Sequence, residues 1–129
     1  MDWHQAQARI REKIKIGTDV NTPKSSYRFV TAVDSPINSS RYGYYNEYGF
    51  IIPIGQSNTV KIPWSMLKEC FAALNSLNGY DGTFFKMRFP LQAKDHPCHV
   101  HVVGQLFVKA GIAQAEDGKS RKYRLVKHS

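Results

Sequence analysis

A line of polar side chains on the helix expected at residues 97–110 is the strongest candidate for chemistry in this sequence. His101, Gln105 and Lys109 follow an i, i+4, i+8 spacing, which stacks them along one edge of a helix. The rest of that helix is apolar and recurs with the helical period. These three side chains can hydrogen-bond to base edges or phosphates, so the pattern predicts a narrow polar contact surface.

A basic hairpin is expected directly after this helix, at residues 112–127. Gly111 can end the helix in the left-handed conformation, and Asp117-Gly118 has the composition of a two-residue hairpin turn. The hairpin is rich in cations, namely Lys119, Arg121, Lys122 and Arg124. A helix with a polar edge beside a cationic hairpin favours contact with a polyanion.

Residues 97–127 resemble the last helix and wing of winged-helix DNA-binding domains. The resemblance rests on the run HVHVVGQLFVKAGIAQAEDGKSRKYRLVK. The resemblance covers about the final quarter of the chain. It implies that the helix enters the major groove, with His101, Gln105 and Lys109 towards base edges. It also implies that the hairpin rests on phosphates through Lys119, Arg121, Lys122 and Arg124. In that family a further helix precedes the groove helix, and only Leu91–His96 is available for it here.

Other chemistry-bearing residues do not form a recognisable site. The stretch His96-x-Cys98-His99-x-His101 contains possible metal ligands, and Cys98 and His101 would lie one helical turn apart. His99 is expected on the apolar side, and no second ligand pair with the usual spacing exists elsewhere in the sequence. The carboxylates are scattered, and Gly79-Tyr-Asp-Gly82 lacks the lysine and the spacing of a phosphate-binding loop. The sequence therefore predicts no metal site, no cofactor and no catalytic activity.

Tyrosines in the segment 41–48 are a second candidate for nucleic-acid contact. Tyr42, Tyr44 and Tyr48 lie beside an arginine, and tyrosines on an open sheet can stack on unpaired bases. Tyrosines also form ordinary cross-strand pairs in hairpins. Both interpretations remain open from the sequence.

Composition bounds the class of protein. The chain has 129 residues, enough for one domain, and 18 Lys and Arg against 10 Asp and Glu, a formal net charge of +8. The excess charge is concentrated in residues 1–30 and 109–129, whereas the middle is nearly neutral. Two cysteines are too few for a disulfide framework, and no apolar run resembles a leader or a membrane span. We therefore expect a cytoplasmic protein without membrane contact.

The elements that must position these residues follow from hydrophobic periodicity. Residues 1–16 are expected to form a docking helix with a thin apolar stripe of Trp3, Ile10 and Ile14. Its other faces carry Arg9, Arg11 and Lys13. Residues 27–62 are expected to form antiparallel strands, including a strand at Tyr27–Val33, a loop at Asp34–Ser40 and a strand pair turning at Asn46-Glu47.

Further along, a helix is expected at 63–78, a strand at 83–89, a helix at 97–110 and the hairpin at 112–127. The fold class is α+β, with an antiparallel sheet of four to five strands covered by two helices, an N-terminal amphipathic helix and a C-terminal β-hairpin. Residues 98–103 also alternate well enough for a strand, so helix and strand remain alternatives there.

The function expected from this pattern is a small basic nucleic-acid-binding protein without catalytic activity, with duplex DNA favoured over RNA. The cations of both ends would supply attraction to phosphates. The alternative is a protein-interaction module that forms a homodimer through the stripe of Trp3, Ile10 and Ile14 or through the hairpin Tyr42–Tyr48.

Overall fold

The computed structural model describes residues 1–22, 25–116 and 122–126. Over these residues the chain forms five helices and two antiparallel sheets of three strands each, which confirms the α+β class. The helices are α1 (Trp3–Lys13), α2 (Trp64–Leu74), α3 (Gly82–Arg88), α4 (Pro90–Asp95) and α5 (His99–Lys109). The strands divide into two sheets instead of the single sheet that was expected.

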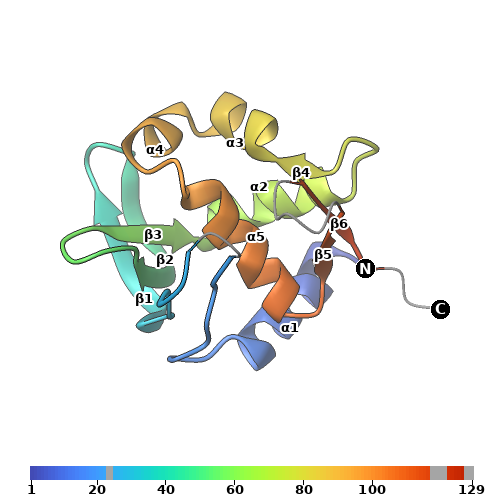
Figure 1. Cartoon of the computed structure of the whole chain (residues 1–129), viewed down its shortest axis with the longest axis horizontal. Helices are drawn as coiled ribbons and strands as arrows, with labels where there is room; N and C mark the ends of the chain where they lie inside the picture. Colours follow the sequence, from blue (N-terminus) through green and yellow to red (C-terminus); the bar gives the residue numbers. More distant parts are fainter. Residues whose placement is uncertain (23–24, 117–121, 127–129) are drawn as a thin grey trace.

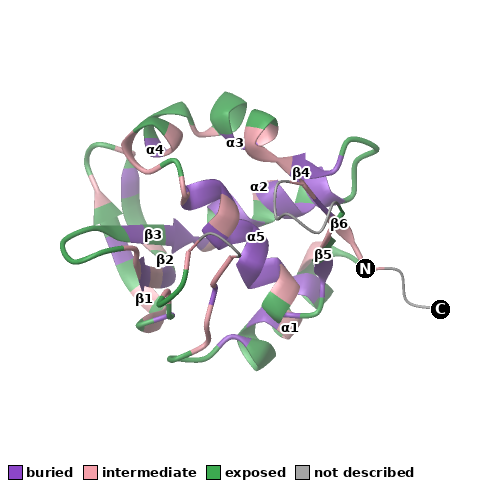
Figure 2. Ribbon diagram, in the orientation of Figure 1, coloured by how far each residue is buried: buried purple, intermediate pink, exposed green. Residues whose placement is uncertain are grey.

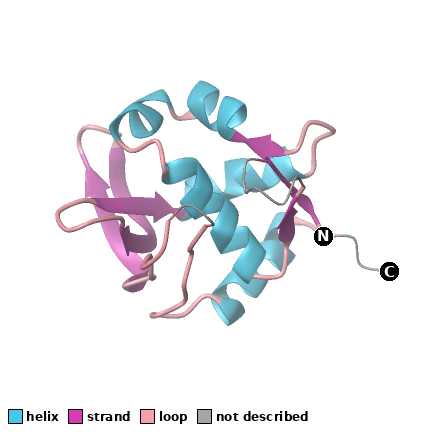
Figure 3. Ribbon diagram, in the orientation of Figure 1, coloured by secondary structure: helices cyan, strands magenta, loops and turns pink. Residues whose placement is uncertain are grey.

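The first sheet has the order β1-β2-β3 and the second has the order β4-β6-β5. The strands of the first are β1 (Ala32–Ser39), β2 (Tyr44–Pro53) and β3 (Thr59–Pro63), and those of the second are β4 (Tyr80–Asp81), β5 (Ala113–Ala115) and β6 (Lys122–Leu125). Figure 1 shows α5 crossing the middle of the molecule between the two sheets, with α1 on one side and α3 and α4 on the opposite side. Colouring by element in Figure 3 shows the same separation of the two sheets.

Helix α1 starts at a complete capping box. The backbone N–H of Gln5 donates to the Asp2 carboxylate at 2.8 Å, and the backbone N–H of Asp2 donates to the Gln5 side chain at 2.8 Å. Its apolar stripe was expected to dock outside the chain. It instead lies in the protein's own core, where Ile10 is fully buried and Ile14 is 1% exposed. Trp3 packs against Trp64, with 6.2 Å between ring centroids.

The first sheet corrects two boundaries. The strand expected at Tyr27–Val33 begins only at Ala32, and the loop expected at Asp34–Ser40 is largely β1. Pro36 is tolerated there because β1 is an edge strand, and the register shifts on either side of the stretch 35–37. The turn expected at Asn46-Glu47 is wrong as well. Asn46 has a φ of +58° inside β2, opposite the second register shift, and the chain reverses at residues 40–43 instead.

Helix α3 replaces the strand expected at 83–89. The Asp81 carboxylate caps it by accepting the backbone N–H of Phe84 at 3.0 Å. Phe85 of the helix and Phe89, which directly follows its last residue, are four residues apart, and their rings pack at 5.1 Å between centroids. The alternating apolar pattern was misleading because it placed the phenylalanines on strand faces, whereas the cap and the i, i+4 pair favour a helix.

Helix α5 forms the centre of the core, which Figure 2 shows as a largely buried element. This resolves residues 98–103 in favour of a helix. The helix ends as predicted. Gly111 has a φ of +74°, its N–H donates to the Val108 carbonyl, and Ile112 N–H donates to the Phe107 carbonyl, which together form a Schellman motif. The turn Asp117-Gly118 lies outside the described residues, but β5 and β6 pair antiparallel as the hairpin required.

Close packing between α5 and β6 depends on a glycine. Tyr123 of β6 is fully buried, and its ring lies against the backbone of α5 at Gly104. A Cβ added at Gly104 would lie 2.3 Å from the Tyr123 ring. The absence of a side chain at this position therefore lets the terminal hairpin close onto the central helix. Buried side chains from α1, α2, α5 and both sheets form one continuous hydrophobic cluster.

Candidate nucleic-acid interface

The chain itself buries the middle of the polar line on α5. Gln105 is 7% exposed, His101 is half-buried, and Lys109 at the end of the helix is exposed. The Lys109 ammonium lies 3.2 Å from the Asp19 carboxylate, so the segment after α1 lies beside α5. That segment is held by its own backbone bonds, including Gly17 N–H to the Val30 carbonyl. The resemblance implied that α5 presents His101, Gln105 and Lys109 to a DNA groove. In this arrangement it does not present them as one open line.

The cations of α1 are differently placed. Arg11 pairs with Asp34 at 3.3 Å, and its guanidinium lies 4.7 Å from the centroid of the Trp64 ring. Lys13 is exposed and lies 4.0 Å from the neighbouring Glu12, at the limit of an ion pair. Arg9 is half-buried and forms no ion pair with any described residue. Arg11 is thus engaged within the fold, whereas Arg9 and Lys13 remain open to an external anion.

Asp34 connects α1 to the first sheet. Burial alone would raise the pKa of its carboxyl, but hydrogen bonds from Arg11 and from the Trp64 indole outweigh that effect and lower the pKa. The indole N–H donates to Asp34 at 2.7 Å. This cluster therefore fixes α1 against β1. It thereby also fixes the position of the helix that carries Arg9 and Lys13.

On the hairpin, the described cations share the outer face of the second sheet. Tyr123 points into the core, so its strand neighbours Lys122 and Arg124 point away from it. Arg124 pairs at 2.9 Å with Glu116, which follows β5, whereas Lys122 has no ion pair among the described residues. Lys119 and Arg121, which were also predicted to contact phosphates, lie outside the described residues.

The N-terminus, from which α1 runs toward the bottom of the view, lies beside the terminal hairpin (Figure 1). In Figure 1 the N-terminus and the end of β6 are both at the right, and the C-terminal end of α5 faces α1. Helix α1 packs directly on α5, and α5 packs on β5. The fold thus brings α1, the end of α5 and the hairpin together from opposite ends of the sequence.

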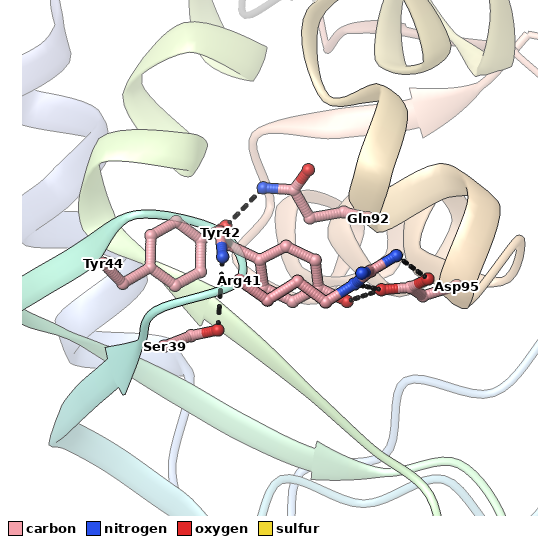
Figure 4. A network of polar contacts seen from close by, with 6 residues as sticks. All are labelled: Ser39, Arg41, Tyr42, Tyr44, Gln92 and Asp95. Atoms are coloured by element: carbon pink, nitrogen blue, oxygen red, sulfur yellow. Dashed lines mark hydrogen bonds and ion pairs between the residues drawn. The ribbon is translucent and has the colours of Figure 1, made fainter.

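The tyrosines proposed for stacking differ in how far they are exposed. Tyr44 is 7% exposed, and its hydroxyl accepts a hydrogen bond from the Gln92 amide at 2.9 Å. The Tyr42 hydroxyl donates to the Asp95 carboxylate at 2.5 Å (Figure 4). Tyr48 is 54% exposed, and its neighbour Tyr45, which the sequence pattern did not single out, is 69% exposed. Stacking on a base is therefore open to Tyr48 and Tyr45, and closed to Tyr44.

The contacts of Tyr42 and Tyr44 belong to a polar network that joins the β1–β2 turn to α4 (Figure 4). The Arg41 guanidinium donates two hydrogen bonds to Asp95, at 2.5 and 2.8 Å. These bonds, followed by the bond from Tyr42, lower the pKa of Asp95 to about 2. Burial, followed by the hydrogen bond to Asp95, raises the pKa of Tyr42 to about 12. The network fixes the turn on α4, which is a structural role for two of the three candidate tyrosines.

The histidines at residues 96–101 do not converge on a metal site. His99 is 1% exposed, its ring stacks on Phe85 at 5.4 Å between centroids, and its Nε2 lies 3.4 Å from the Lys61 carbonyl. Burial lowers the pKa of His99 to about 4, so the ring is neutral at pH 7. Over the described residues, no three His, Cys, Asp or Glu side chains gather where one metal ion could bind them.

None of the described helices has the length and apolar content needed to cross a membrane. Comparison of the chain with protein family models, with curated proteins and with solved structures finds no match.

Proposed function

We propose that this protein binds nucleic acid, with duplex DNA as the preferred form, through phosphate contacts from α1 and the terminal hairpin. The observation that carries the proposal is that α1, the end of α5 and the hairpin, which carry the excess cations, pack in succession on one another. Attraction between several lysines or arginines and the phosphate backbone is strong, independent of sequence and sensitive to salt. Arg9, Lys13 and Lys122 are the described cations most available for it.

Support for a winged-helix-like arrangement comes from the order of the elements after β3. Helix α2, strand β4, helices α3 and α4, helix α5 and the hairpin follow one another, and β4 pairs with the hairpin. The helices α3 and α4 occupy the place before α5 for which the sequence offered only Leu91–His96. Because Gln105 is buried, phosphate contacts and not base reading supply the binding.

The homodimer alternative loses one of its two surfaces. Ile10 and Ile14 are buried within the chain, and Trp3 packs on Trp64 and Phe71. In the hairpin 42–48, Tyr42 and Tyr44 are engaged in the network with α4. Tyr45 and Tyr48 of that hairpin stay exposed, so a dimer through this surface is the second candidate, and nucleic-acid binding is the function we propose.

The test is binding to a fluorescent duplex oligonucleotide, measured by anisotropy over a range of salt concentrations. The variants Arg9→Glu/Lys13→Glu and Lys122→Glu/Arg124→Glu are each expected to weaken binding about tenfold or more. Removing one cation from a phosphate is expected to reduce the slope of log affinity against log salt by about 0.9. A single strand of the same sequence is measured in parallel to establish which form is preferred.

The matched control is Lys86→Glu/Lys94→Glu, which changes the net charge equally on α3 and α4, at the opposite side of the molecule (Figure 1). It is expected to retain most of the affinity. Equal weakening by all three variants would mean that net charge alone attracts the oligonucleotide. That result, or an absence of binding at low salt, would contradict the proposed interface.

A separate prediction concerns Lys109. Asp19→Asn removes the carboxylate that lies 3.2 Å from its ammonium, so Lys109 becomes available for a phosphate. We expect tighter duplex binding and a salt slope steeper by about 0.9. The control Glu47→Gln removes the same charge from the first sheet, where Glu47 contacts Ser65. If both variants change binding equally, Lys109 is not part of the interface.

A further inference from the structure

A groove on the surface between α2, α3 and β6 was not anticipated from the sequence. It has a volume of about 520 Å³ and lies between the second half of α2 and α3, with β4 and β6 at one end. This volume falls within the range of about 300–1,000 Å³ that is usual for sites of small organic molecules. The groove is lined by no residue of α1 or α5, and the one residue it shares with the interface proposed above is Lys122.

The walls of the groove are largely apolar. Ala73 of α2 and Phe84 and Met87 of α3 line it. Met87 is 79% exposed although it lies on the wall of the groove. A large apolar side chain this exposed at the wall of a concavity is a feature of sites that take an apolar group.

The charged groups of the groove are unequally satisfied. Glu69 forms an ion pair with Arg88, and the Asp81 carboxylate accepts the Phe84 N–H that begins α3. Lys122 also lines the groove, and it forms no ion pair with any described residue, although it lies opposite Asp81 in the strand register. The lining thus contains two carboxylates that already have partners and one ammonium without a counterion in the described part of the chain.

From this combination we infer that the groove binds a small organic monoanion with an apolar body. The carboxylate or sulfonate group pairs with Lys122, and the apolar body lies against Phe84, Met87 and Ala73. A charge-assisted hydrogen bond at a partly enclosed apolar site supplies both affinity and orientation. The site is a binding site only, and no reaction is assigned to it.

The experiment compares three probes of nearly one shape and different charge, namely 2-naphthoate, 2-naphthamide and 2-naphthylmethylammonium. Binding to the ¹⁵N-labelled chain is followed by NMR, through the backbone amides of Ala73, Gly79, Thr83 and Lys122. The anion is expected to shift these amides and to bind about tenfold more tightly than the neutral amide. The cation is expected to bind more weakly than both.

Two variants test the residues involved. Lys122→Met keeps an apolar side chain and removes the ammonium, so it should abolish the preference for the anion over the amide. Met87→Ser, at a position exposed enough to leave the fold intact, removes apolar contact without adding charge and should weaken all three probes. Lys86→Met removes one charge from α3 outside the groove and should leave the binding of all three unchanged.

The inference is overturned if the three probes bind equally, if the shifted amides lie outside the groove, or if Lys122→Met and Lys86→Met have the same effect. Tightest binding by the cation would also overturn it, because the carboxylates Glu69 and Asp81 would then govern the site.

Discussion

Replacement of Gly104 by alanine is expected to lower the free energy of unfolding by about 3 kcal/mol, near the upper end of overpacking costs. The added Cβ would lie 2.3 Å from the ring of Tyr123, which is fully buried between α5 and β4. The ring cannot rotate away without leaving the core, so either the hairpin shifts or α5 moves. Urea denaturation at pH 7 measures the loss.

A double-mutant cycle separates this clash from other effects of the substitution. Tyr123→Leu shortens the side chain, so Gly104→Ala should be much less costly in that background than in the natural sequence. Gly55→Ala is the control, because a Cβ there meets nothing within 4 Å. If Gly104→Ala costs the same in both backgrounds, the glycine is not required for the contact with Tyr123.

Acid is expected to destabilise the fold through His99, by about 3 kcal/mol. The pKa of His99 is lowered from 6.5 to about 4 by burial, so the unfolded chain binds a proton at a pH where the folded chain does not. This contribution to stability is complete above pH 6.5, is lost as the pH falls from 6.5 to 4, and changes no further below pH 4. Denaturation curves at pH 7, 5.5 and 4 follow the loss.

The variant His99→Leu should remove most of this dependence between pH 6.5 and 4. His4→Gln should leave it unchanged, because His4 is exposed on α1. The carboxyls of Asp34 and Asp95, whose pKa values are lowered by their arginine partners, act mainly below pH 4 and so fall outside the measured window. Equal acid sensitivity of the His99→Leu variant and the natural chain would show that another group is responsible.

The sequence pattern of neighbouring residues predicted those parts of the fold that are stabilised by contacts between residues close in the chain. The apolar periodicity of 63–78 and 97–110 identified α2 and α5, and Gly111 identified the end of α5, since a Schellman motif involves only neighbouring residues. The pairing of β5 with β6 also followed, because the two strands are close in sequence. The α+β class was correct for the same reason.

Errors occurred where a distant segment decides the outcome. Residues 83–89 alternate like a strand, but the ring of His99 from α5 packs on Phe85 and adds to the local Asp81 cap in favour of a helix. Residues 34–39 have the composition of a loop, yet β2 offers them pairing partners along an edge. Whether a short segment pairs or turns depends on what lies beside it in the fold.

For the candidate interface, the sequence by itself determined which residues carry charge, that both ends are basic, and that His101, Gln105 and Lys109 share one edge of a helix. Only the tertiary structure decided that Gln105 on this edge is buried, that the stripe of α1 fills the core, and that a groove lined by Lys122 lies between α2 and α3. The physical reason is that periodicity reports the direction of each side chain relative to its own element. Burial and ion pairing depend on which other element occupies the space that the side chain faces.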